Sequence, residues 1–441
     1  MPPGQYVVLG MARPQAPWFS DVARWANSGA LPVDFLMVLS MEELSARLRS
    51  GRVFSALLID AGVPGCDRDL FDLARGAGCA VIVIDDLPAR RPWVDLGAAL
   101  VLSAAPGRDE LLAALREAAR PVQRADEADL RVTPSDAAAP RSSWRAPLVV
   151  LTGAGGTGRS TLAMALAAGL AVDPRDHGAV VLVDGSLHAQ QGLLHDAGDV
   201  VPGLSELVDA HRSGDLDPDQ VRQLCYQVGE SGYDLLLGLR RQRDWAALRP
   251  RALAAALDGL RRSYRAVVAE VDADVEGETE CGSVDVEERN LLARSTLMAA
   301  DVVLGIGLPG LGGLHSLLRV LADVRELGVE PSRVVPVLNR APRNPRARAD
   351  LSRALGALAG RVLDGADLAS TPLFVPERRR LDDQLRDSAG LPAAMGIPLA
   401  AAVRAVLDRV AARPAGLSSG PVAVPPGSLG SWTTYPTEGT G

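Results

Sequence analysis

The chain has 441 residues, enough for two or three domains, and 47% of them are hydrophobic, as in a protein with well-formed cores. Its formal net charge of −8 argues against a general nucleic-acid binder, because such proteins present a basic surface. No apolar run reaches the ~18 residues of a membrane span, and no basic region followed by an apolar stretch opens the chain. The four cysteines and five histidines show no metal-ligand spacing. We therefore expect a cytoplasmic protein with reduced thiols.

The basic residues have an unusual composition, because all 46 of them are arginine. A bias toward GC-rich codons explains the loss of surface lysines, where arginine serves equally well. A lysine inside a phosphate-binding loop is harder to replace, because the guanidinium is planar and wider than an ammonium group.

Short apolar runs alternate with helical stretches over residues 1–120. Apolar runs without alternation are typical of buried parallel strands, so this region predicts a parallel α/β domain. The stretches "FSDVARWANSG" and "MEELSARLRS" are predicted helices between strands. The five predicted strands are "YVVLG", "VDFLMVL", "SALLID", "CAVIVID" and "AALVLS".

Composition then divides the rest of the chain into three parts. Residues 121–147 are polar and rich in Pro and Ala, which predicts a linker. A second alternation of strands and helices over 148–412 predicts a second α/β domain. Residues 413–441 are rich in Pro, Gly, Ser and Thr, which predicts a disordered tail.

The second domain opens on the pattern of a phosphate-binding loop, G-x-x-x-x-G-K-[ST], with arginine in place of lysine. In such loops backbone N–H groups surround phosphate oxygens, the lysine reaches the outer phosphates, and the hydroxyl binds magnesium. A predicted strand precedes the loop and a helix of small residues follows it. We therefore predict a weakened site for ATP or ADP with Mg²⁺, formed by Gly153, Gly155, Gly156, Thr157, Gly158, Arg159, Ser160 and Thr161.

This loop resembles the deviant Walker A motif of the ParA/MinD family, K-G-G-x-G-K-[ST], and the resemblance extends over roughly residues 147–412. It implies a SIMIBI-type P-loop domain with a mostly parallel sheet. The family's first lysine reaches across a dimer to the partner's nucleotide, and its position here is Ala154. Both family lysines are therefore missing.

The resemblance implies that Ser160, Asp184 and Glu270 bind magnesium. Asp184 matches the first aspartate of the family's D-x-D motif, but Ser186 replaces the second, which positions the attacking water. Glu270 replaces an aspartate after the fourth strand. The acidic segment that follows either opposes ATP or is a solvated insert. We assign no catalytic residue and expect ATP hydrolysis to be lost or very slow.

Two later positions resemble the family's base-binding segments. Asn339, in "VVPVLNRAPR", matches the asparagine that reads adenine, and Pro372 matches the later loop beside the base. An asparagine after a strand is also a common turn residue, so this part of the resemblance has an alternative explanation.

In the first domain, "SALLIDAGVPG" resembles the third strand of response-regulator receivers, with Asp60 at the phosphoacceptor position and Pro64 and Gly65 after it. A receiver's magnesium-binding acids are absent from "LGMARP", and Ala105 replaces the lysine before Pro106. The resemblance implies a flavodoxin-like fold with degenerate chemistry, used for docking or dimerisation.

A receiver-like domain joined to a ParA/MinD-type domain resembles the CpaE/TadZ group, which localises and helps to assemble Tad (Flp-type) pili, and the Ssd-like septum-site-determining group. This implies a spatial organiser at a cell pole or septum. The implied partners are a second copy of the chain and pilus-assembly or division proteins, which would supply peripheral membrane association. We expect no specific nucleic acid, and interpret Arg340, Arg343, Arg346 and Arg348 as a solvated face rather than a DNA or partner patch. The alternatives are an active ATPase that uses Arg159 and a signalling protein with a phosphorylated receiver.

Overall fold

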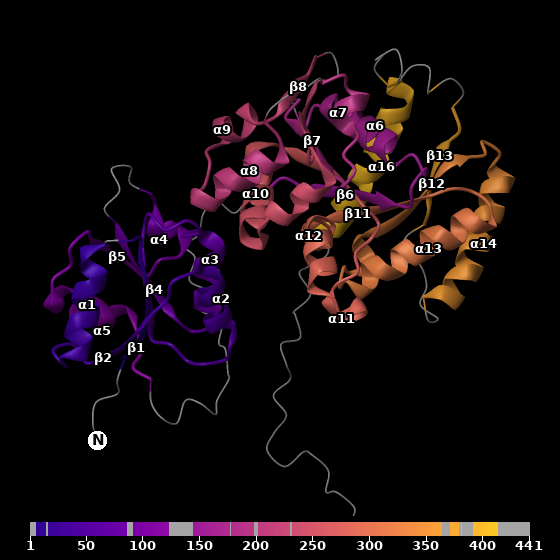
Figure 1. The fold of residues 1–441 in the computed structure, drawn as a ribbon. Coiled ribbons are helices and arrows are strands. Elements are labelled where there is room, and N and C mark those ends of the chain that lie inside the picture. The colour runs from indigo at the N-terminus through magenta and orange to yellow at the C-terminus, as the bar shows by residue number, and fades with distance from the viewer. Residues whose placement is uncertain are drawn as a thin grey trace, which may run out of the picture.

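A computed structural model of the chain contains two β-sheets, each covered by helices on both faces (Figure 1). The predicted tail at 413–441 and most of the predicted linker at 121–147 lie outside the residues that the structure describes. The described residues are 6–14, 16–85, 91–122, 144–176, 178–197, 202–229, 232–363, 371–378, 381 and 391–412.

The first sheet is parallel throughout and has the order β2-β1-β3-β4-β5. This is the flavodoxin-like strand order, so the predicted fold of the first domain is confirmed. Its central strand is buried at every residue, as its uninterrupted apolar run predicts. The strands are β1 (Tyr6–Met11), β2 (Val33–Met37), β3 (Ala56–Asp60), β4 (Ala80–Asp85) and β5 (Leu100–Ser103).

In the part of this domain that the structure describes, five helices enclose the sheet. On one face, α1 (Pro17–Asn27) and α5 (Arg108–Ala118) bury apolar side chains that include Trp18 and Leu111. On the other face lie α2 (Met41–Arg49), α3 (Arg68–Gly76) and α4 (Trp93–Leu96).

The second sheet has eight strands in the order β13-β12-β11-β6-β10-β7-β9-β8. Neighbours are parallel except that β8 runs antiparallel to β9. This confirms the predicted mostly parallel sheet, and it places β6 near the centre. The strands are β6 (Leu148–Gly153), β7 (Val180–Gly185), β8 (Tyr226–Val228), β9 (Tyr233–Leu236), β10 (Ala266–Val271), β11 (Val302–Gly307), β12 (Val334–Ala341) and β13 (Leu373–Pro376).

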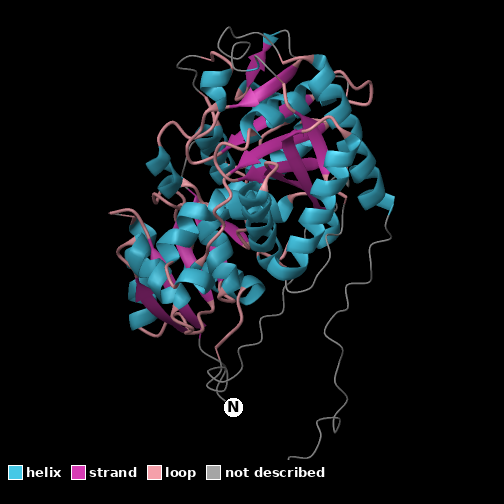
Figure 2. Cartoon of the chain, turned by 90° about the vertical axis from the view of Figure 1, so that its right-hand side faces the viewer, coloured by secondary structure: helices cyan, strands magenta, loops and turns pink. Residues whose placement is uncertain are grey.

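Helices cover this sheet on both faces as well, and Figure 2 shows both sheets enclosed by them. On one face lie α6 (Arg159–Ala171) and α16 (Ala393–Ala412). Larger helices on the other face are α8 (Leu204–Ser213), α10 (Pro250–Ser263), α12 (Val284–Ala299), α13 (Leu311–Glu326) and α14 (Pro345–Val362). The short helices are α7 (Gln191–Leu194), α9 (Pro218–Gln223), α11 (Glu278–Cys281) and the 3₁₀ turns η3 (Gln242–Ala247) and η4 (Pro331–Arg333).

Helices α6 and α16 approach each other closely at two glycines. A Cβ at Gly169 would lie 2.2 Å from the carbonyl oxygen of Gly396, and a Cβ at Gly396 would lie 2.4 Å from the carbonyl oxygen of Ala165. The backbones can therefore touch only because both positions lack a side chain. This contact covers α6, the helix that follows the predicted phosphate-binding loop.

The two units contact each other through α3 of the first and α8 and α10 of the second (Figure 1). The contact includes pairs of opposite charge, in which acids at α3 face arginines on α8 and α10 and Arg68 of α3 faces an acid after α8. Among the described residues, three ion pairs cross it: Arg212–Asp67 at 2.6 Å, Arg251–Asp72 at 2.6 Å and Arg68–Asp215 at 2.8 Å. Within the described ranges of the chain, no helix is both long and apolar enough to cross a bilayer.

Candidate phosphate-binding site

The predicted phosphate-binding loop joins β6 to α6, and the backbone requires glycine at most of its glycine positions. Gly156 and Gly158 have φ values of 77° and 83°, in the left-handed region that favours glycine. A Cβ at Gly153 would lie 2.5 Å from the carbonyl oxygen of Ile306 on β11. At Gly155 a Cβ would meet nothing within 4 Å. Three of the four predicted glycines thus have a structural reason that does not depend on a ligand.

The loop is also held by hydrogen bonds from two side chains. The Thr157 hydroxyl donates to the carbonyl oxygen of Ala154 at 2.7 Å, and the Asn339 Nδ2 donates to the carbonyl oxygen of Thr157 at 2.8 Å. The Asn339 Oδ1 accepts from the backbone N–H of Arg340 at 2.9 Å. The structure therefore shows Asn339 supporting the loop, and its contact with a base stays a prediction.

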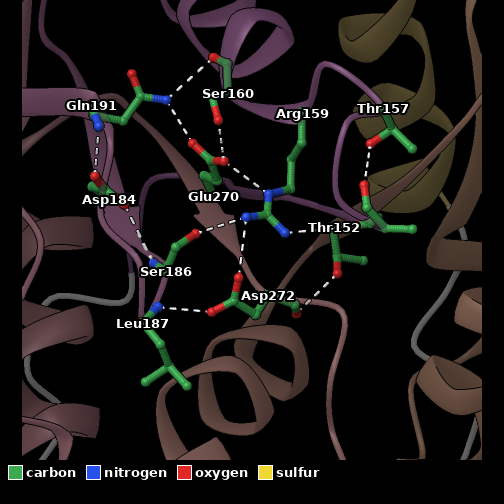
Figure 3. A network of polar contacts seen from close by, with 12 residues as sticks. Thr152, Thr157, Arg159, Ser160, Asp184, Ser186, Leu187, Gln191, Glu270 and Asp272 are labelled. Atoms are coloured by element: carbon green, nitrogen blue, oxygen red, sulfur yellow. Dashed lines mark hydrogen bonds and ion pairs between the residues drawn. The ribbon is translucent and has the colours of Figure 1, made fainter. Parts of the chain in front are cut away.

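Arg159 is the first residue of α6, and its guanidinium turns toward the ends of the neighbouring strands (Figure 3). Its Nε donates to the Glu270 Oε1 at 2.8 Å. Its Nη2 donates to the Ser186 Oγ at 3.0 Å and to the Asp272 Oδ1 at 3.2 Å, and its Nη1 donates to the carbonyl oxygen of Gly153 at 3.2 Å. The side chain is only 17% exposed. The guanidinium thus bridges two acids and a hydroxyl within the protein.

The predicted metal ligands Ser160 and Glu270 contact each other directly. The Ser160 hydroxyl donates to the Glu270 Oε1 at 2.6 Å, which is the oxygen that Arg159 also contacts. The other oxygen, Oε2, accepts from the Gln191 Nε2 at 2.6 Å. Gln191 is fully buried and also donates to the carbonyl oxygen of Ser160 at 3.2 Å. Gln191 was not predicted from the sequence, because its only local sign is a pair of glutamines that would suit an exposed turn.

Asp184, the third predicted metal ligand, is buried at the end of β7, in register with Glu270 on β10. Its Oδ2 accepts from the backbone N–H of Gln191 at 2.8 Å, and its Oδ1 accepts from the backbone N–H of Ser186 at 3.4 Å. Burial raises the pKa of Asp184 to about 7, and the negative charge of Glu270 adds to the shift. Gln191 thus links Asp184 to Glu270. No group of three or more His, Cys, Asp or Glu side chains is placed to hold a metal ion within the described part of the chain.

Asp272, just beyond β10, is a second residue that the sequence analysis missed. Its Oδ1 faces Arg159, its Oδ2 accepts from the backbone N–H of Leu187 at 2.7 Å, and its carbonyl oxygen accepts from the Thr152 hydroxyl at 3.1 Å. The acidic segment was expected to oppose ATP or to be solvated. At Asp272 the structure differs from both expectations, because this partly buried acid is paired with Arg159 and with the backbone N–H of Leu187.

The remaining predicted residues divide between the amino end of β13 and the segment that runs from the carboxyl end of β12 into α14. Pro372 comes directly before β13. Arg348 is half-buried, donates from its Nε to the carbonyl oxygen of Pro342 at 2.7 Å and lies over the ring of Phe374. The other three arginines of the predicted face, Arg340, Arg343 and Arg346, are exposed.

The first domain has a similar arrangement at Asp60. This aspartate ends β3 and is buried, and its Oδ1 accepts from the Arg13 Nε and from the backbone N–H of Gly62, both at 2.8 Å. Arg13 follows β1, where a receiver would carry its magnesium-binding acids. A cationic side chain therefore pairs with Asp60 at the place where a receiver's acids are missing from this sequence.

The chain matches no protein-family model and no curated protein. Among solved structures it is similar to a ParA family ATPase from Chlorobium tepidum, with 17% identity and a TM-score of 0.42 over 60% of this chain and 99% of that one. It is similar to the septum site-determining protein MinD of Pyrococcus horikoshii complexed with Mg-ADP, with 20% identity and a TM-score of 0.39 over 62% and 98% of the two chains. It is also similar to a putative plasmid partition protein from Borrelia burgdorferi bound to AMPPNP, with 14% identity and a TM-score of 0.43 over 60% of this chain and 99% of that one. At these values the likeness carries no functional argument. The strand order and the loop themselves identify a P-loop NTPase-like α/β domain beside a flavodoxin-like one.

Proposed function

We propose that the protein is a spatial organiser of the CpaE/TadZ or septum-site-determining type, related to the ParA/MinD ATPases, and that it acts without hydrolysing ATP. The observation that carries the proposal is the position of the Arg159 guanidinium. It pairs with Glu270, Asp272 and Ser186, the groups at the strand ends beside the loop. The joining of a receiver-like sheet to a P-loop sheet supports the same choice of family branch.

Hydrolysis needs groups that this arrangement does not supply. A phosphoryl-transfer site requires a cation over the phosphates and a group that positions the attacking water. Here the Ser186 hydroxyl stands where the family has its second aspartate, and it contacts Arg159 at 3.0 Å. Losses of charge stabilisation and of water positioning each cost on the order of 10²-fold in rate. Together they bring turnover to background.

Weak nucleotide binding is compatible with the same site. The loop keeps its glycine conformations, and α6 keeps its N-terminal dipole, which favours an anion. Neither feature depends on the missing lysines. We therefore propose that ATP or ADP binds weakly, and that the protein forms its homodimer and its contacts with pilus-assembly or division proteins through other surfaces.

Two measurements test this function. Steady-state ATP hydrolysis by the purified full chain is expected at background, with no difference from Ser160→Ala. In cells, a fluorescently tagged chain is expected to form a focus at a pole or septum, and the focus should persist in Ser160→Ala. Turnover that Ser160→Ala abolishes would instead identify an active ATPase, and a diffuse signal would exclude the spatial role.

A further inference from the structure

Three acids beside the loop have all of their carboxylate oxygens in hydrogen bonds with the protein (Figure 3). Each of the two carboxylate oxygens of Glu270, Asp272 and Asp184 accepts a hydrogen bond from the protein. Arg159 is the cation in this network, and it contacts both Glu270 and Asp272. The donors are Arg159, Ser160, Gln191 and the backbone N–H groups of Ser186, Leu187 and Gln191.

This donor set does not fit the magnesium ion that a P-loop fold implies. Mg²⁺ requires oxygen lone pairs directed at one point in a near-octahedral shell. Here the Ser160 hydroxyl directs its proton at Glu270, and the guanidinium lies between Glu270 and Asp272. A second cation at this point would also be repelled by Arg159.

We propose that Arg159 is the resident cation of this site, and that the loop accepts the phosphates of a nucleotide without a divalent metal ion. The inference rests on the nucleotide binding proposed above and concerns only which cation balances the acids. The same replacement occurs independently at Asp60, where Arg13 lies at 2.8 Å. In a chain without lysine, arginine thus occupies both positions where the related folds use a metal ion.

The first experiment compares the affinity for ATP in millimolar Mg²⁺ and in EDTA by isothermal titration calorimetry on the full chain. The wild-type Kd is expected to agree within about twofold between the two conditions, because the Arg159 guanidinium already occupies the position between Glu270 and Asp272. Arg159→Lys cannot span Glu270 and Asp272 together, so its ATP affinity should become about tenfold higher in Mg²⁺ than in EDTA.

A wild-type affinity that falls about tenfold in EDTA would overturn the inference and leave the proposed nucleotide site standing. Failure to bind ATP in both conditions would contradict the proposed nucleotide site instead. Whether Arg159 takes the place of a divalent metal ion would then be decided by a second experiment that uses no nucleotide.

The second experiment measures the melting temperature of the full chain with and without millimolar Mn²⁺. Arg159→Ala leaves Glu270 and Asp272 without their cation, so its Tm is expected to fall and Mn²⁺ to restore part of the loss. The wild-type Tm should not respond to Mn²⁺. The matched control is Arg261→Ala, which removes an ion pair with the single carboxylate of Asp301 at 2.7 Å, and Mn²⁺ should not restore its Tm.

A rise of the wild-type Tm with Mn²⁺ would overturn the inference, because it would place a divalent ion beside Arg159. A loss of stability in Arg159→Ala that Mn²⁺ does not restore would overturn it as well, since the guanidinium would then not stand in for such an ion.

Discussion

At the scale of single residues, the two arginines that pair with buried acids define the chemistry of this protein. An acid left inside a protein is stable only when it is neutralised or paired. Arg159 pairs with Glu270 and Arg13 pairs with Asp60, whereas Asp184 lacks a cationic partner of its own among the contacts described above. For Asp184 the protonated, neutral form is favoured instead, because burial raises its pKa to about 7.

This shift predicts how stability depends on pH. An unfolded aspartate has a pKa of ~3.9, so between roughly pH 4 and 7 the folded state holds a proton that the unfolded state has lost. The free energy of unfolding therefore falls as pH rises through this window, by about 1.4 kcal/mol for each unit of pKa shift. In Asp184→Asn this fall should disappear. The free energy of unfolding of the variant, measured in urea, should therefore rise relative to that of the wild type between pH 5 and pH 8. A stability difference that stays constant with pH would contradict the shift.

Asp60 provides a second prediction at this scale. Its Oδ1 already accepts from Arg13 and from Gly62. We expect incubation with acetyl phosphate to leave the intact mass unchanged, because the described residues around Asp60 include no metal ligand set to stabilise the transferring phosphoryl group. A phosphoryl adduct that disappears in Asp60→Ala would instead identify a signalling receiver.

At the scale of elements, the close contact of α6 and α16 predicts an asymmetric response to two glycine substitutions. In Gly396→Ala the new Cβ would lie 2.4 Å from the carbonyl oxygen of Ala165, so the helices must separate. The expected loss is about 1–3 kcal/mol of unfolding free energy. Gly356 lies on the exposed side of α14 with nothing within 4 Å of its Cβ position. Gly356→Ala should gain roughly 0.5–1 kcal/mol, because alanine stabilises a helix. Equal effects of both changes in urea unfolding would argue against the close contact.

The strands and the phosphate-binding loop were more predictable from the sequence than the contacts of Arg159 were. Strands such as β3 and β10 are apolar except for Asp60 and Glu270 near their carboxyl ends, because helices cover both of their faces, and this pattern is visible in the sequence alone. The loop was recognisable because its glycines follow local backbone rules. The partners of Arg159 were not predictable, since Glu270 is 111 positions away and the sheet brings them together. Gln191 was missed for the same reason, because its burial depends on distant strands.

At the scale of the whole molecule, the contact of α3 with α8 and α10 depends on charge. Arg251 contacts Asp72 at 2.6 Å, and its backbone N–H donates to Asp69 at 2.9 Å. In Arg251→Asp a new carboxylate would face these two acids, so we expect the units to separate and the radius of gyration in solution X-ray scattering to rise. Adding Asp72→Arg should reverse the rise by restoring an opposite pair. Arg353→Asp, on exposed α14, makes the same charge change away from the contact and should have no effect. Failure of the double exchange to reverse the rise would contradict this contact.

Self-association is the second prediction at this scale. Because Ala154 supplies no charge across a dimer, nucleotide should not drive a sandwich dimer of the P-loop units. Light scattering should give the same mass for the full chain with and without Mg-ATP, and any dimer should weaken in a version lacking residues 1–120. A monomer that becomes a dimer only with Mg-ATP would show that an arginine has taken over the role of the missing lysine.

The position of β6 in the sheet has a consequence for synthesis of the chain. This strand is wholly buried, yet its two neighbours, β10 and β11, both come much later in the sequence. The 111 positions between Arg159 and Glu270 take a ribosome roughly 5–20 s to translate at ~5–20 residues per second. Throughout that interval the backbone N–H and C=O groups along both edges of β6 have no partner strand, and its apolar side chains lack the finished core. We expect the nascent chain to depend on a chaperone in this interval, and chains that terminate before β10 to aggregate.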